Sequence, residues 1–302
     1  MQFSIYQESR RGARKSNQDR VAYCYSRSAL LMLLADGMGG HLRGEMAAQI
    51  AEQSVTQAFR REARPRLSDP GAFLREAFTG AHRAIIQGAA DAGLPEAPRT
   101  TCVACVVQDG IACWAHAGDS RLYHMRDGRI LAQTKDHSLV QQLIDSGRMR
   151  EEALPAHPDR NRIFNCLGSL RPPRVDICAT TRLNTGDVLL LCSDGLWSPL
   201  SAKIISSAIL KNGIMQAVPE LLDEAERRAG HECDNLSAIA LAWEEHAPTE
   251  QPDQGRPLQS IAAPPQETGA AAAPGEYLAD DEIERAIARI RSAIKGQADD
   301  KT

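Results

Sequence analysis

The sequence predicts an α+β protein whose strands pair in an antiparallel arrangement. Asp109-Gly110 and Asp127-Gly128 each separate two short runs with strand character, and such pairs are the strongest short-range signal for a β-hairpin. Two other segments, 44–63 and 72–90, repeat apolar residues at helical spacing. With 302 residues, 43% of them hydrophobic, the chain can form one large domain with an appendage.

The expected elements follow one another in a simple order. Strand signals open the chain, the two helices follow, and a meander of strands comes next. A short helix within 138–149 and an irregular segment rich in proline and charge over 151–173 separate the meander from the last elements. Those elements are a strand, a long helix over 203–228 and a final strand. The strand segments are 3–6, 21–26, 29–35, 100–110, 111–120, 121–128, 129–134, 187–197 and 234–243.

Charge and hydropathy exclude several classes of function. The net charge is -4 and the sequence has no basic block, so we expect proteins or small anions as partners and no nucleic acid. The N-terminus has no apolar run followed by a cleavage site, and no stretch reaches the ~18 apolar residues that a membrane span needs. We therefore expect a cytoplasmic protein without a membrane span.

The cysteines indicate buried, reduced thiols, because most of the eight lie within apolar runs. Cys102 and Cys105 form a CxxC, but they lie inside a strand-like run, with no second pair at zinc-finger spacing. A zinc or redox role is the less favoured alternative.

Aspartates recur where strands begin or end. The apolar run Leu30–Leu34 is followed by Ala35, Asp36 and Gly37, and a second run, Val188–Leu191, leads to Asp194 and Gly195. A buried strand thus delivers a carboxylate beside a glycine, whose backbone allows a close approach to a ligand. The full set of aspartates at strand ends or in tight turns next to strands is Asp19, Asp36, Asp119, Asp194 and Asp234.

Five carboxylates brought together would repel one another unless cations neutralised them. The set contains no cysteine or histidine, and ligation by oxygen alone favours a hard ion. The sequence therefore predicts a site for Mg²⁺ or Mn²⁺ rather than for zinc.

The motifs in this order resemble those of the metal-dependent Ser/Thr protein phosphatases, the PPM family or type 2C phosphatases, in their compact bacterial form. The resemblance covers roughly residues 5–243. Its motifs are RKSNQD from Arg14, ADGMGGH from Ala35, TT at Thr100, GDSR from Gly118, DHS from Asp136, HPDRN from His157, LCSDGLW from Leu191 and DN at Asp234.

The resemblance implies an α-β-β-α sandwich, in which two antiparallel sheets pack together between helices. It also implies a core site for two Mn²⁺ or Mg²⁺ ions. Asp36 would bridge the two ions and the Gly37 carbonyl would bind one of them, while Asp19 would be a ligand or hold metal-bound water. Asp194 and Asp234 would bind the same pair of ions, and Asp119 would bind a third, weaker ion.

The same resemblance assigns catalytic roles. Arg14 would clamp the substrate phosphate through its planar fork of donors, and Asp36 would act through the metals it bridges. Eukaryotic members carry a histidine directly after the Asp-Gly, where this chain has Met38. His41 is a candidate proton donor to the leaving group, and a loop histidine without a catalytic role is the alternative. Residues 138–173 correspond to the flap of the family, which helps to select substrates.

These assignments predict a phosphoprotein phosphatase that hydrolyses phosphoserine and phosphothreonine with metal-activated water. It would oppose a bacterial Ser/Thr kinase in signalling, and its partners would be phosphorylated proteins and a cognate kinase. One alternative is a phosphatase dedicated to a single phosphoprotein and recruited through the tail. The other is a catalytically dead scaffold, against which the intact aspartate set argues.

The chain divides into three parts by composition. We expect the phosphatase domain over 1–245 and a disordered Pro/Ala-rich linker over 246–275. Residues 276–302 predict an amphipathic helix with Ile283, Ile287, Ile290 and Ile294 on one face. This helix would either dock on its own domain or bind a partner.

Overall fold

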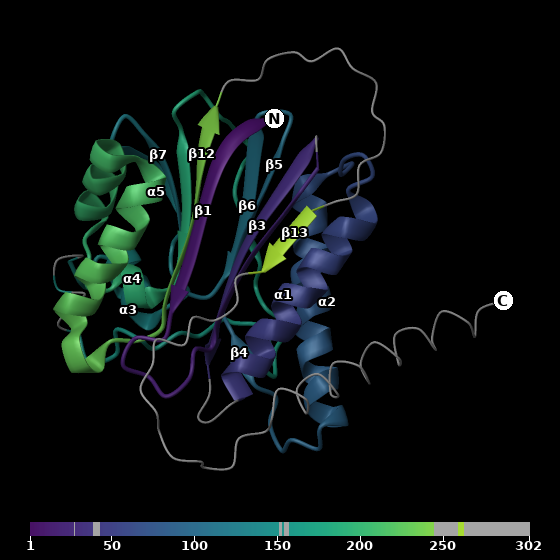
Figure 1. Ribbon diagram of the computed structural model, residues 1–302. Helices are drawn as coiled ribbons and strands as arrows, with labels where there is room; N and C mark the ends of the chain where they lie inside the picture. The colour runs from purple at the N-terminus through teal and green to yellow at the C-terminus, as the bar shows by residue number, and fades with distance from the viewer. Residues whose placement is uncertain (27, 39–42, 151–152, 154–156, 245–258, 263–302) are drawn as a thin grey trace.

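The protein is a four-layered sandwich with two β-sheets in the middle and helices on both outer faces (Figure 1). The computed structural model describes residues 1–26, 28–38, 43–150, 153, 157–244 and 259–262. The expected α-β-β-α architecture is therefore confirmed. Both sheets are antiparallel throughout the described strands.

The first sheet has five strands, and two of its central strands, β12 and β11, come from the second half of the chain. Their spatial order is β1-β12-β11-β7-β8. The bounds are β1 Gln2–Arg10, β12 Leu236–Glu244, β11 Val188–Cys192, β7 Arg121–Arg126 and β8 Arg129–Gln133.

The second sheet has the order β10-β6-β5-β3-β2-β13, with β4 paired to β3 and β9 paired to β6. Its bounds are β10 Thr181–Arg182, β6 Ile111–Ala117, β5 Cys102–Gln108, β3 Ala29–Met38, β2 Asp19–Tyr25, β13 Gln259–Ala262, β4 Arg99–Thr100 and β9 Asp176–Ile177. Thus β3, which carries the apolar run singled out in the sequence, lies inside the sheet with neighbours on both sides.

The Asp-Gly pairs form the expected hairpin turns. Asp109 and Asp127 have φ of 54° and 49°, and the glycines after them also have positive φ. This backbone matches the type I′ turn, whose twist suits two antiparallel strands. The two turns join β5 to β6 and β7 to β8.

The helices cover the outer faces of the sheets (Figure 1). The helices α1 and α2 pack on the second sheet, and α4 and α5 pack on the first. A change of direction occurs inside α5 at Gly213, which has φ 67°. The bounds are α1 Arg43–Glu62, α2 Pro70–Asp91, α3 Leu139–Asp145, α4 Asp194–Trp197 and α5 Ala202–Ala229, with a 3₁₀ turn over Gly230–Glu232.

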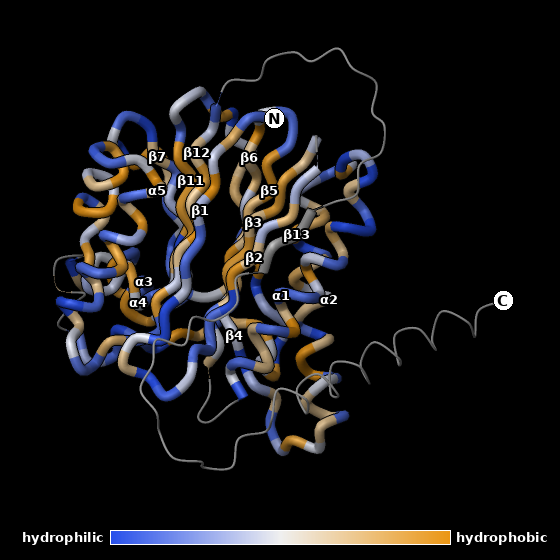
Figure 2. Tube along the Cα trace, viewed as in Figure 1, coloured by the Kyte–Doolittle hydropathy of each residue, from blue (hydrophilic) through white to orange (hydrophobic). Residues whose placement is uncertain are grey.

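Three apolar clusters hold the four layers together. Two lie between a sheet and its helices, and the third lies between the sheets. On β3, Leu31 and Leu33 belong to the cluster with the helices, whereas Leu30 and Leu34 belong to the one between the sheets. A strand that is buried on both faces has a continuous run of apolar residues in its sequence. Accordingly, the central strands in Figure 2 are apolar along much of their length.

All eight cysteines are free, as expected. Cys102 faces the helices and Cys105 faces the other sheet. Residues three apart on a strand point to opposite faces, so this CxxC cannot act as a pair at one site.

The segment expected to be a disordered linker departs from that expectation at Gln259–Ala262, which form β13 against β2. The physical reason is the edge of the sheet: β2 would otherwise present unpaired backbone groups, which readily accept another strand. The rest of 246–275 and the helix predicted over 276–302 lie outside the described residues. Among the helices that the structure describes, none is long and apolar enough to cross a membrane, and a cytoplasmic location stays a prediction.

The packing between the sheets predicts a clear difference between two leucines. Leu191 on β11 is fully buried between the sheets, and Leu131 on β8 is 48% exposed. Replacing a buried leucine with alanine removes apolar contacts and leaves a cavity, so Leu191→Ala should lower the free energy of unfolding by about 3 kcal/mol. Leu131→Ala is the control and should cost less than ~1 kcal/mol. Urea denaturation of both variants tests this, and equal losses would contradict the layer assignment.

Candidate metal centre and phosphate site

The five predicted aspartates lie at one end of the sandwich, the lower end in Figure 1 where β4 pairs with β3. Asp19 opens β2 and lies opposite Asp36 of β3 in the strand register. Asp194 follows β11 and begins α4, and Asp234 lies two residues before β12. Asp119 lies in the turn between β6 and β7. The ends of strands from both sheets thus deliver the set to one place.

The electrostatics of the site reflect this convergence. Burial raises the pKa of Asp36 well above its usual range, and the charges of the other four aspartates raise it further. Asp194 has a raised pKa for the same reasons, partly offset by Arg14. Burial also raises the pKa of Asp19 to about 6 and that of Asp119 to about 7. Carboxyl groups that are hard to ionise together are those that a cation would stabilise.

Asp19 provides a direct test of whether a cation fits. The Ser193 hydroxyl donates to Asp19 Oδ2 at 2.8 Å. The other oxygen, Oδ1, is buried without a hydrogen-bond partner in a side chain that is 2% exposed. A buried carboxylate oxygen without a donor is costly unless an ion satisfies it. The donor set is made of oxygen alone, so the residues fit a hard divalent cation.

The spacing of the carboxylates suits a hydrated cation. Among the described residues, no three of these aspartates place an oxygen each within 4.8 Å of one another. Mg²⁺ usually keeps several waters and takes only one or two carboxylates. The arrangement therefore does not resemble a cage that encloses a single ion.

Arg14 contacts this cluster from the loop between β1 and β2. Its Nη2 donates to Asp234 Oδ2 at 2.6 Å, and this contact raises the pKa of the guanidinium. The Arg14 side chain is 57% exposed, so most of its planar donor group is accessible from solvent. The structure thus places the predicted phosphate-binding arginine beside the aspartates.

The loop that carries Arg14 is fixed by Asn235. The Asn235 amide donates to the carbonyls of Arg11 and Ser16 at 2.8 and 2.9 Å, and its oxygen accepts from the N–H of Gln18 at 2.8 Å. Gly12, with φ 62°, allows the loop to pass over Asp234, because a Cβ there would lie 2.1 Å from the Asp234 carbonyl oxygen. The DN motif therefore combines a candidate ligand with the residue that holds the phosphate loop.

Thr100 and Thr101 connect two of the aspartates. The Thr100 hydroxyl donates to the Asp36 carbonyl at 2.8 Å, and the Thr101 N–H donates to the same oxygen at 2.9 Å. The Thr101 hydroxyl also lies 2.6 Å from the hydroxyl of Ser120, next to Asp119. The TT motif thus fixes the spacing between the strand that carries Asp36 and the turn that carries Asp119.

The Asp119 turn has a second support on the side of the first sheet. The Trp197 indole donates to the Asp119 carbonyl at 2.9 Å, and the Arg121 guanidinium lies 3.6 Å from the centre of the Trp197 ring. Arg121 in turn binds both oxygens of Asp136, at 2.8 and 2.7 Å. Three motifs, GDSR, DHS and SDGLW, therefore meet around one turn.

The sequence motifs contain the residues that support the aspartates but do not show what these residues do. Sequence patterns identify the carboxylates and not the groups that orient them. The supporting residues are Thr100, Thr101, Ser193, Trp197 and Asn235. Ser193, Trp197 and Asn235 each lie within three residues of a predicted ligand, and Thr100 and Thr101 form the TT motif. Gly37 lies where expected and contacts α1 closely, since a Cβ on it would lie 2.2 Å from the Gly44 carbonyl oxygen. His41 lies outside the described residues.

An antiparallel two-sheet sandwich with aspartates at its strand ends defines a class of metal-dependent hydrolase, and comparison with known proteins identifies the family. A model of the protein phosphatase 2C family matches residues 6–227. The chain is 32% identical over 237 residues to a putative protein phosphatase 2C-type of Streptococcus pyogenes, covering 77% of this chain and 93% of that protein. The chain therefore belongs to the protein phosphatase 2C family and is a protein phosphatase.

Solved structures agree with this assignment. The Ser/Thr phosphatase Stp1 of Staphylococcus aureus superposes with a TM-score of 0.74 at 29% identity, over 81% of this chain and 96% of that one. The catalytic domain of the Ser/Thr protein phosphatase PstP, solved in complex with two manganese ions, gives a TM-score of 0.68 at 30% identity, over 80% and 99% of the two chains. The family and fold expected from the motifs are thus confirmed.

The raised pKa values of Asp19 and Asp119 predict how pH affects stability. A carboxyl group has a pKa near 3.9 when unfolded, so between about pH 4 and 7 the folded metal-free protein binds more protons than the unfolded chain. The contribution of these two carboxyl groups to the free energy of unfolding should therefore fall as pH rises through this range. A divalent cation replaces those protons, so Mn²⁺ should raise the melting temperature more at pH 7.5 than at pH 5.5.

Thermal denaturation with chelator and with Mn²⁺ at the two pH values measures both effects. Asp119→Asn serves as the comparison, because it removes one of the titrating groups and should reduce the dependence on pH. A metal-free protein that is equally stable at pH 5.5 and 7.5 would contradict the assignment.

Proposed function

We propose that this phosphatase hydrolyses phosphoserine and phosphothreonine in proteins, and that it opposes a bacterial Ser/Thr kinase in signalling. The observation that carries the proposal is the convergence of five aspartates and Arg14 at one end of the sandwich. The bacterial relatives named as Ser/Thr protein phosphatases support the choice of substrate.

In this proposal the aspartates hold divalent cations. Asp36, the Gly37 carbonyl, Asp194 and Asp234 would hold two of them, and Asp119 would hold a third. Bound cations would polarise the phosphoryl group and lower the pKa of water to near neutrality. The structure of PstP with two manganese ions supports Mn²⁺ as one of the cations used.

The side chains of this protein then orient the reactants. Ser193 fixes one oxygen of Asp19 by donating to it, and the other oxygen, Oδ1, has no hydrogen-bond partner and could bind a cation. Arg14 presents several N–H donors in one plane, and this geometry matches two oxygens of a phosphate. The serine or threonine that leaves needs a proton, and His41 stays the candidate for this role. Water rather than a side chain is the nucleophile in this proposal, so no covalent phosphoenzyme forms.

Turnover of an aryl phosphate with Mn²⁺, with Mg²⁺ and with chelator tests the proposal directly. We expect hydrolysis that requires the metal, and Asp194→Asn should reduce it by about 100-fold or more because a ligand to the charge-stabilising cation is lost. A phosphothreonine peptide and a phosphotyrosine peptide then separate the substrate classes. A folded wild type that binds Mn²⁺ but hydrolyses none of these substrates would leave a phosphoprotein-binding scaffold as the alternative.

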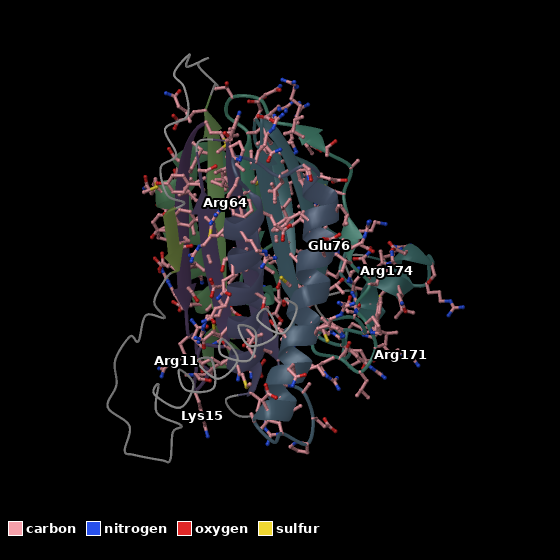
Figure 3. All side chains as sticks on the ribbon, turned by 90° about the vertical axis from the view of Figure 1, so that its right-hand side faces the viewer. Arg11, Lys15, Arg64, Glu76, Arg171 and Arg174 are labelled. Carbon is pink, nitrogen blue, oxygen red and sulfur yellow. The ribbon has the colours of Figure 1, made fainter. Side chains whose placement is uncertain are left out.

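Arg14 and its neighbour Lys15 allow a matched test of phosphate binding. Lys15 extends from the same loop at the lower end of the molecule in Figure 3 and is exposed. A hydrogen bond to a charged group contributes roughly 1.5–3 kcal/mol, so Arg14→Ala should lower kcat/KM by about 10-fold or more. Arg14→Lys should recover only part of this loss, because lysine lacks the planar fork. Lys15→Ala is the control, and an equal loss in both alanine variants would mean that only the charge of the loop matters.

A further inference from the structure

His137 is a buried residue of the DHS motif, and none of the roles described above involves it. It is 3% exposed and lies between the turn that carries Asp119 and the segment 157–176. The His137 N–H donates to the Gly118 carbonyl at 2.9 Å, and the Gly118 N–H donates to His137 Nδ1 at 3.1 Å. Backbone and side chain of His137 together thus hold the residue directly before Asp119.

The other side of the His137 ring contacts the neighbouring segment. Asn165 Nδ2 lies 2.6 Å from His137 Nδ1, and Asp176 Oδ2 lies 3.2 Å from His137 Nε2. Asn165 is itself fixed, since its oxygen accepts from the Arg174 N–H and its amide donates to the Arg174 carbonyl, both at 2.8 Å. Arg174 also binds both oxygens of Asp176. Figure 3 shows Arg174 on the part of the chain that projects beyond α2.

These contacts fix the tautomer of His137. The Arg174 N–H needs an acceptor, so the oxygen of the Asn165 amide faces Arg174 and its nitrogen is the atom next to His137. His137 Nδ1 therefore faces two N–H donors, from Gly118 and Asn165, and must act as an acceptor. The ring proton then lies on Nε2 and points to Asp176. A histidine held in this way is a rigid link rather than a solvent-exposed side chain.

A metal ion in this cluster is the alternative explanation, because His116, His137 and Asp176 bring one ligand atom each within 4.8 Å of one another. The rings of His116 and His137 stack at 4.6 Å with an interplanar angle of 14°. An imidazole binds a metal in the plane of its ring, and two stacked, nearly parallel planes do not meet at a common ion. His116 Nε2 also lies 2.7 Å from the Lys135 carbonyl. The cluster is therefore a hydrogen-bonded network.

We propose that His137 is a positioning residue that couples the segment 157–176 to the metal centre, by holding the Gly118–Asp119 turn on one side and Asn165 and Asp176 on the other. The inference rests on the proposed role of Asp119 as a metal ligand. The turn itself has little freedom to adjust, because Gly118 has φ 120° and packs against Thr101, so that a Cβ would lie 2.5 Å from the Thr101 Cβ. A change in the position of His137 is thus passed on to Asp119.

A second set of contacts supports the coupling. The Phe164 N–H donates to the His137 carbonyl at 3.0 Å. Leu167 pairs with Thr100 through two backbone hydrogen bonds of 3.2 and 2.9 Å. Thr100 in turn holds the Asp36 carbonyl. The same segment that contacts His137 therefore also contacts the support of Asp36, so both candidate ligands are linked to one piece of chain.

Two substitutions of His137 separate positioning from packing. Asparagine places its oxygen where Nδ1 lies, so His137→Asn keeps the acceptor for Gly118 and Asn165. Glutamine reaches toward Asp176 but withdraws that acceptor, so His137→Gln loses the link to the turn. Residues that orient metal ligands typically change metal affinity by 10–100-fold. His137→Gln should therefore weaken Mn²⁺ binding at the Asp119-dependent site by about 10-fold, and His137→Asn should stay within about 3-fold of wild type.

The experiment measures Mn²⁺ binding by isothermal titration calorimetry on the full chain, with Asp119→Asn identifying the Asp119-dependent part of the binding. Asn165→Ala tests the coupling from the other side. The hydrogen bonds of Asn165 described above go to His137 and Arg174 and not to an aspartate of the site, yet this substitution should weaken the same binding several-fold. Ser169→Ala is the matched control: Ser169 donates to the Cys166 and Arg171 carbonyls in the same segment and leaves His137 untouched. It should bind Mn²⁺ as the wild type does.

Each result decides the proposal. Weakened binding in His137→Gln and Asn165→Ala, with recovery in His137→Asn, supports it. Equal weakening in His137→Gln and His137→Asn, with an equal loss of melting temperature, would show that His137 only packs and would overturn it. Wild-type binding in Asn165→Ala would also overturn it, and this variant decides alone if His137→Gln fails to fold. Unchanged binding in Asp119→Asn, with turnover still dependent on metal, would remove the role of Asp119 and His137 while leaving the phosphatase activity in place.

Discussion

The mutual repulsion of five aspartates is the constraint on which the rest of this structure depends. The pKa values of Asp19, Asp36, Asp119 and Asp194 rise because burial and neighbouring negative charges both disfavour ionisation. A flexible chain would move such groups apart. Here each group is attached to the end of a strand inside a packed sandwich, so the free energy of the apolar core keeps the carboxylates together until cations bind.

The position of the site at the seam between the sheets follows from this constraint. Asp19 and Asp36 come from the second sheet, whereas Asp194 lies just after β11 and Asp234 just before β12 of the first. The hydrogen bond from Ser193 to Asp19 crosses the seam directly. The relative position of the sheets is set by the apolar cluster between them. Packing far from the metal centre thus determines its dimensions.

Much of the fold could be predicted from the sequence, because the signals were local. The apolar run of β3, the Asp-Gly turns and the helical stripes each report on a few neighbouring residues. The register that places Asp19 opposite Asp36 could not be obtained this way, since it depends on pairing between strands. The strand β13 was missed for a similar reason: its partner is an edge of the sheet far away in the sequence.

The candidate ligands could also be predicted, because aspartates recur at strand ends or in tight turns next to strands, and Asp36, Asp119 and Asp194 lie beside a glycine there. The residues that orient them could not. Asn235, Thr101 and Trp197 act through backbone carbonyls and N–H groups, and nothing in their residue type shows which backbone group they meet. Only the folded chain brings these groups together.

Trp197, Thr100 and His137 share one physical property: they hold the backbone next to a carboxylate and leave its oxygens free, whereas Ser193 donates to a carboxylate oxygen of Asp19. Trp197 contacts the Asp119 carbonyl, Thr100 contacts the Asp36 carbonyl, and His137 contacts Gly118. A donor placed on the carboxylate itself would satisfy the oxygen and compete with a cation for it. Fixing the backbone instead keeps the ligands both positioned and available. Because Thr100 and His137 are themselves hydrogen-bonded to the segment 157–176, the part of the chain that is expected to select substrates is also part of the structure that holds the candidate metal ligands.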